Sequence, residues 1–97
     1  MDSIHALWGS AYRLYGWVGP NLIRLTGDFQ DDHIRLQFVL FDAVGEDEIE
    51  DYRCAATEIL ADFQTATMTE DFIVVASLSA CKELHELPVR IFSRKLA

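Results

Sequence analysis

The sequence has few of the features on which several protein classes depend. Its two cysteines, Cys54 and Cys81, cannot provide the disulfide framework of a small secreted domain. No apolar run approaches the roughly 18 residues that a transmembrane helix requires. The first residues, MDSIHALWGS, lack the basic start and the small-residue cleavage site of a secretory signal. We therefore expect a cytoplasmic protein with reduced cysteines.

Basic residues are also scarce. Eight lysines and arginines stand against sixteen aspartates and glutamates, which gives a formal net charge of −8. Phosphate backbones and anionic lipid surfaces would repel such a chain, so we expect it to bind neither nucleic acid nor membrane. So large an excess of one charge weakens a small domain by self-repulsion, and solubility does not require it. A basic protein partner would explain it, although an acidic helix face can also be merely solvated.

Motifs for known chemistry are absent. The chain has no GxxxxGK[ST], GxGxxG, GxSxG or HExxH pattern, and its three histidines lie in separate predicted elements. His33, beside Asp31 and Asp32, has the neighbours of a general base, but a solvated turn histidine is the more common arrangement. Four acids at residues 42 and 46–48 lack the loop spacing of an EF-hand. The sequence therefore predicts no catalytic residue, no cofactor and no metal.

The strongest pattern that is present is a helical one in residues 45–64. Carboxylates crowd its first turn, where the helix dipole favours them, and Gly45 can serve as the N-cap. Its apolar residues recur at helical spacing and form one stripe: Ile49, Tyr52, Ala56, Ile59, Leu60 and Phe63. The opposite face is strongly acidic: Asp47, Glu50, Asp51, Cys54, Glu58 and Ala61, flanked by Thr57 and Asp62.

The remaining elements are a helix in residues 3–15 and four strands. Two alternating runs, 23–29 and 34–41, flank a polar turn of hairpin length. Residues 72–78 form a continuous apolar run, typical of a central strand buried on both sides, and 89–94 are typical of an edge strand. The order α-β-β-α-β-β predicts one α/β domain over residues 1–97, an α+β two-layer fold with a four-stranded mixed sheet packed by two helices. A helical crossover between strands two and three favours a parallel pair and the strand order 1-2-3-4.

Several side chains can be assigned to a face of this sheet. Ile23, Leu25, Gly27 and Phe29 share one face of the first strand, and Arg24 and Thr26 would point to water from the other. Val39 and Phe41 interrupt the polar face of the second strand, so we expect a cover there, provided by the first helix. Residues 79–88 are compatible with a short helical turn or with a loop.

Four segments resemble a family of small bacterial immunity proteins. They are the turn at 20–22 (PNL), the strand 34–41 with Asp42, the acid-rich helix start at 46–48, and 55–63, which reads AATEILADF. The resemblance covers about residues 18–95. It is to immunity proteins of contact-dependent growth inhibition toxins and related polymorphic toxins. The chain departs from the family pattern at 80–87, where a shorter loop containing proline would be expected.

The resemblance implies an inhibitor that is not an enzyme. Such proteins bind the C-terminal domain of a cognate toxin and cover its active site. Many of these toxins are nucleases, whose substrate grooves are basic, so the implied partner matches the charge of this chain. We expect a monomer. The alternatives are a structural or regulatory subunit that homodimerises through an edge strand, and an enzyme that uses His33. Charge and exposure predict the following toxin-binding residues: Asp31, Asp32, Asp47, Glu50, Asp51 and Glu58.

Overall fold

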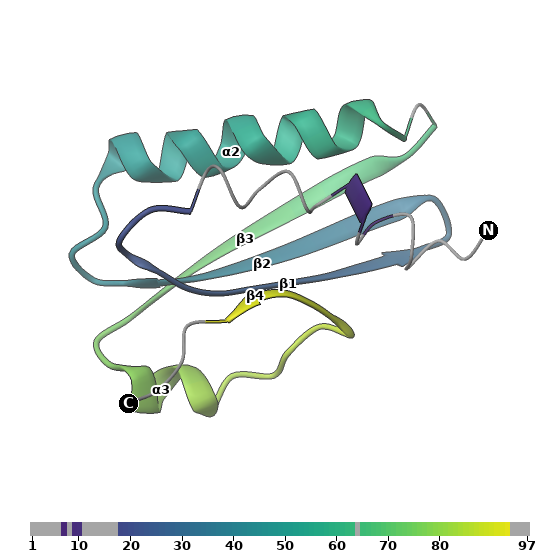
Figure 1. Cartoon of the computed structure of the whole chain (residues 1–97). Coiled ribbons are helices and arrows are strands. Elements are labelled where there is room, and N and C mark those ends of the chain that lie inside the picture. The colour runs from purple at the N-terminus through teal and green to yellow at the C-terminus, as the bar shows by residue number, and fades with distance from the viewer. Residues whose placement is uncertain (1–6, 8, 11–17, 64, 94–97) are drawn as a thin grey trace.

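The computed structural model describes residues 7, 9–10, 18–63 and 65–93, and it contains a mixed sheet with helices on both of its faces (Figure 1). This is the predicted α+β fold, and the predicted order of elements recurs with one short helix added. The elements are β1 (Leu22–Gln30), β2 (His33–Phe41), α2 (Glu46–Ala61), β3 (Thr67–Val75), α3 (Leu78–Lys82) and β4 (Val89–Ser93).

The strands lie in the order β3-β2-β1-β4. The β1–β2 hairpin is antiparallel, and β2 pairs in parallel with β3 across α2, both as predicted. The predicted order 1-2-3-4 is wrong, because β4 pairs with β1 and not with β3. The chain after β3 therefore crosses the sheet beneath β2 and β1, so that β3 and β4 form the two edges.

Helix α2 covers one face of the sheet and begins at the predicted N-cap, Gly45. The helix ends at Ala61, earlier than predicted. Phe63 therefore lies beyond its last turn, half-buried, with its ring 5.1 Å from that of Phe29. The main core fills the space between helix and sheet, and its buried residues are Leu7, Leu22, Leu25, Ile34, Leu36, Phe38, Leu40, Tyr52, Ala55, Ala56, Ile59, Val89 and Ile91.

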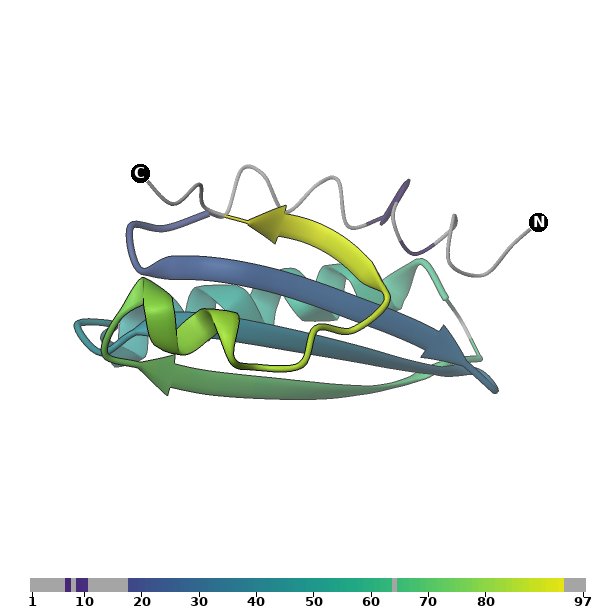
Figure 2. The same cartoon turned by 90° about the horizontal axis from the view of Figure 1, so that it is seen from below.

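The other face of the sheet carries a second cluster under α3. Seen from below, α3 and the loop after it lie in front of the sheet, with α2 behind (Figure 2). Val39 and Phe41 are covered as predicted, but by Cys81 and Leu84, whereas Leu7 of the first helix belongs to the main core. Ile23 also belongs to this cluster. A bulge between Leu22 and Arg24 turns it away from the face predicted for it.

The prediction that Arg24 and Thr26 point to water is wrong, because α3 and the loop after it cover this face of β1. Arg24 is 6% exposed, and its guanidinium donates to the carbonyl oxygens of Cys81 and Leu84, each at 3.3 Å, and to Oε1 of Gln37 at 3.2 Å. The hydroxyl of Thr26 is fully buried and accepts a bond from the N–H of Leu87 at 3.2 Å. These bonds fasten α3 and its loop to the sheet.

Strand β3 differs from its prediction in extent and in position. It covers Thr67–Val75, whereas the sequence predicted a strand over 72–78. It is an edge strand and not a central one, and Val74 is 51% exposed. Residues Leu7, Gly9 and Ser10 are helical, as predicted for the first helix, while the rest of that helix lies outside the described residues. Among the described residues, no helix is long and apolar enough to cross a membrane.

Candidate interaction surface

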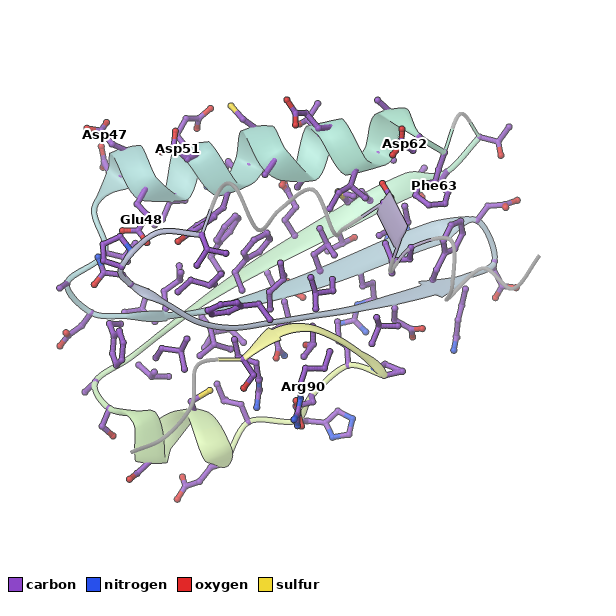
Figure 3. The ribbon with its side chains drawn as sticks, viewed as in Figure 1. Asp47, Glu48, Asp51, Asp62, Phe63 and Arg90 are labelled. Carbon is purple, nitrogen blue, oxygen red and sulfur yellow. The ribbon has the colours of Figure 1, made fainter. Side chains whose placement is uncertain are left out.

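The acidic residues of α2 lie on its solvent face. Asp47, Glu50, Asp51 and Glu58 are all exposed, as the helical spacing predicted. Figure 3 shows Asp47 and Asp51 directed away from the sheet. From Asp47 to Glu58 the helix rises by about 16 Å, at 1.5 Å per residue. The acids therefore form a ridge along most of α2, on an element whose other side is fixed by the core.

These four acids differ in whether they make an ion pair within the protein. Oε2 of Glu50 lies 3.6 Å from Nη1 of Arg53, and both side chains are more than half exposed. Asp47, Asp51 and Glu58 make no ion pair with any residue that the structure describes. We define these three residues as the α2 acidic ridge, because their carboxylates are the ones left for a partner.

Glu48, in the same first turn, has an internal role that the sequence did not indicate. Its carboxylate accepts bonds from the hydroxyl of Tyr52 at 2.6 Å, and from the backbone N–H and side-chain amide of Asn21 at 3.1 and 2.9 Å. The Tyr52 oxygen in turn accepts from the N–H of Gly19 at 3.0 Å. A Cβ at Gly19 would lie 2.7 Å from Oε2 of Glu48, so a larger residue there would have to displace this carboxylate. The clasp fixes the start of α2 against the turn before β1.

The second predicted patch, Asp31 and Asp32, forms the tip of the β1–β2 hairpin. Both residues are exposed and have positive φ values of 52° and 60°, the conformation of a two-residue type I′ turn, which aspartate tolerates. The hairpin tip lies at the far end of β1 from Asn21, where α2 begins (Figure 1). A strand of nine residues spans about 30 Å, so the structure does not bring Asp31 and Asp32 to Asp47.

A third acidic group, missed by the sequence analysis, lies between α2 and β3. Glu70 shares the α2 side of β3 with Met68 and Phe72, and burial raises the pKa of its carboxyl although the nearby Arg53 opposes the shift. Its Oε2 is buried and has no hydrogen-bond partner. Arg53 lies 5.3 Å from the centroid of the Phe72 ring. Met68 and Phe72 are an even number of residues apart and so share one face of a strand, which was the signal that could have extended this strand towards Thr67.

His33, which the sequence offered as a general base, is held between β2 and β3. Both ring nitrogens of His33 face threonine hydroxyls on β3, Nδ1 at 2.6 Å from Thr67 and Nε2 at 2.8 Å from Thr69, so the ring bridges two strands. It neither pairs with Asp31 or Asp32 as a base nor lies free in a turn. Among the described residues, no three His, Cys, Asp or Glu side chains are grouped so that they could hold a metal ion. Cys54 is exposed, Cys81 is buried, and both are free.

The sequence model of the MafI2 immunity protein family matches residues 4–96, nearly the whole chain. The chain belongs to this family. No curated protein matches it at a significant level. The predicted relationship to bacterial immunity proteins is confirmed, and membership in such a family implies a cognate toxin that the protein neutralises.

For a MafI2-family immunity protein, the structure divides the acids into two kinds. The carboxylate of Glu48 is half-buried and already accepts hydrogen bonds from Asn21 and Tyr52. The α2 acidic ridge and the hairpin tip are exposed, and they lie on separate parts of the surface. A compact toxin surface need not touch both.

Proposed function

We propose that this immunity protein neutralises a toxin with a basic active-site groove, a nuclease, by binding over that groove through the α2 acidic ridge. The observation that supports the proposal is the ridge itself. Asp47, Asp51 and Glu58 are exposed on one face of a rigid helix and have no ion-pair partner among the described residues. The net charge of −8 adds a long-range field of the same sign.

The physical argument concerns charge complementarity. A nuclease must attract a phosphate backbone, so its substrate groove is basic, and the same groove attracts a surface of carboxylates. The attraction acts mainly on the rate of encounter, and it weakens as salt screens it. The core and the Glu48 clasp already hold α2 in place. Little backbone conformational entropy is therefore lost when the ridge binds.

The proposed mechanism is occupancy and not chemistry. The bound protein excludes substrate from the toxin, turns over no substrate and needs neither metal nor cofactor. We further propose that it acts as a monomer in the cytoplasm, where a nuclease toxin meets its substrate. Inhibition should therefore be stoichiometric.

The test compares two sets of neutralising substitutions. The ridge variant carries Asp47→Asn, Asp51→Asn and Glu58→Gln; the tip variant carries Asp31→Asn and Asp32→Asn, because asparagine tolerates positive φ. Stopped-flow mixing with the toxin domain encoded beside this chain gives the association rate. We expect the ridge variant to associate about tenfold more slowly at low salt and to lose most of its salt dependence.

The tip variant is the matched control, because it removes charge from a surface far from the ridge. It should associate within about threefold of the parent, the difference that a change in net charge alone produces. If both variants associate like the parent, recognition does not depend on these carboxylates. If only the tip variant is slow, the toxin contacts the hairpin end and not α2.

A further inference from the structure

We propose that the outer edge of β3, together with the side of α2 that lies over it, is a docking site for an extended basic segment of the toxin, which adds to the sheet as another strand. This inference rests on the proposed function and specifies its binding mode. It concerns the side of α2 next to the ridge, so a toxin on the ridge can reach both.

The edge of β3 offers backbone groups without partners. In the described part of the chain, β3 pairs with β2 alone, and Figure 2 shows it along one side of the sheet. The N–H of Thr67 donates to the carbonyl oxygen of Asp32, towards β2. Because successive residues of a strand alternate, Met68, Glu70, Phe72 and Val74 direct their N–H and C=O groups outwards. Such an edge is a template for another strand.

The α2 side of this edge is partly apolar. Val74 is 51% exposed, the one large hydrophobic residue of the described chain that is so exposed. Next to it on the same face, Phe72 is half-buried and stacks on Phe38, with ring centroids 4.8 Å apart. An added strand would cover both side chains with its own, so backbone pairing and apolar contact would occur together.

The acidic residues beside the β3 edge favour a basic segment as the added strand. A pocket on α2 is lined by Glu46, Asp47, Ile49, Glu50 and Arg53. Its members Glu50 and Arg53 lie close enough to Glu70 for their charges to act on that carboxyl. The buried Oε2 of Glu70 has no hydrogen-bond donor. A lysine or arginine on the α2 side of an added strand would supply that donor and would meet the carboxylates of the pocket.

The same charges disfavour a second copy of this chain at the edge. Asp71 is the central residue of β3, so an antiparallel pair of two β3 strands would place Glu70 and Asp71 of one copy beside those of the other. Directly opposed residues lie about 5 Å apart, and like charges at that distance are destabilising. Charged residues on an edge strand are a common protection against self-pairing.

Hydrogen exchange of the unmodified chain tests the proposal directly. The chain is measured alone and in complex with the toxin domain encoded beside it. We expect the outward amides of β3, those of Met68, Glu70, Phe72 and Val74, to exchange about tenfold or more slowly in the complex. The inward amides alternate with them and are bonded to β2 already, so they serve as internal controls.

A pair of substitutions at Val74 separates the backbone from the side chain. Val74→Pro removes one outward N–H, and an edge strand tolerates proline at such a position. Val74→Thr keeps the N–H and the branched shape. We expect Val74→Pro to weaken toxin binding by about tenfold, since a buried acceptor on the added strand would lose its donor. Val74→Thr should stay within about threefold.

Each outcome decides between the two proposals. A complex whose outward β3 amides remain unprotected overturns strand addition and leaves the inhibitor role intact. Failure to form any complex overturns the proposed function, and the inference with it. Protection of the same amides in the chain alone, rising with its concentration, would assign the edge to a second copy. If Val74→Pro does not fold, the exchange of the unmodified complex gives the decision.

Discussion

Replacing Tyr52 by phenylalanine removes one oxygen atom from the clasp that joins α2 to the turn before β1. The ring of Tyr52 is buried and stacks on Phe38, with centroids 5.4 Å apart, and phenylalanine keeps that contact. The hydroxyl is the part that acts on the turn. It donates to Oε2 of Glu48 at 2.6 Å and accepts from the N–H of Gly19 at 3.0 Å. The substitution therefore removes these two hydrogen bonds between described residues and keeps the ring contact.

The expected cost follows from the two bonds. A hydrogen bond to a charged carboxylate contributes about 1.5–3 kcal/mol, and the bond from the Gly19 amide about 1 kcal/mol. Glu48 retains its two bonds from Asn21, so its charge is not left unpaired. We expect Tyr52→Phe to lower the free energy of unfolding by about 2–4 kcal/mol. The free energy of unfolding of a small domain is about 5–15 kcal/mol, so this loss would be a large part of it.

Urea unfolding of the variant and the parent measures this difference, and an unchanged m-value would show that the unfolded state is the same. Glu58→Gln, on the exposed face of the same helix, is the control and should change stability by less than about 0.5 kcal/mol. Combining Tyr52→Phe with Glu48→Gln should cost less than the sum of the single changes. A cost of Tyr52→Phe below about 0.5 kcal/mol, or strict additivity, would refute the clasp.

Two further predictions concern stability. Arg24→Ala should cost about 2–4 kcal/mol in urea unfolding, because it leaves the buried carbonyl oxygens of Cys81 and Leu84 without their donor. Glu70→Gln should stabilise the protein at pH 7. Burial raises the folded-state pKa of this carboxyl, so its charge opposes folding above that pKa, and the gain should vanish as the pH falls below its unfolded value near 4.

Controls for these two changes are available in the same sheet. Arg35 is a half-exposed arginine whose Nη2 lies 3.6 Å from Oδ2 of Asp71, so Arg35→Ala should cost less than about 0.5 kcal/mol. If Arg24→Ala lowers stability no more than Arg35→Ala does, Arg24 does not hold α3 on the sheet. For Glu70→Gln, urea midpoints at pH 7 and pH 4 are compared. A difference that does not depend on pH would show that the charge of Glu70 is not what destabilises the fold.

The local elements were the part of the fold that the sequence predicted well. Helix α2 has four turns with one consistent apolar stripe, and that period identifies both its core side and its exposed acids. The hairpin and its polar tip were equally clear. The surroundings of three side chains were predicted wrongly, because a bulge moved Ile23 to the other face and because α3 and its loop cover Arg24 and Thr26. The sequence of a strand does not show where a one-residue bulge occurs. It also does not show which distant segment, here α3 and its loop, packs over it.

The strand order and the layout of the acids required the tertiary structure. A weakly alternating final strand can pair with either free edge, and nothing in the sequence of β4 distinguishes β1 from β3. The polar start of β3 was not predicted as part of the strand, because an edge strand has little need for apolar residues. The candidate acids were identified correctly as exposed, but their separation into a ridge and a distant tip depends on how β1 runs beneath α2.

The most direct test of the central claim is a titration of toxin activity. The purified cognate toxin domain, at a fixed concentration well above the dissociation constant, receives increasing amounts of the immunity protein. Activity should fall in proportion to the amount added and reach zero at one immunity protein per toxin, with the added protein recovered unchanged in the complex. Activity that is unaffected at a molar excess, or that is abolished by a small fraction of an equivalent, would contradict neutralisation by occupancy.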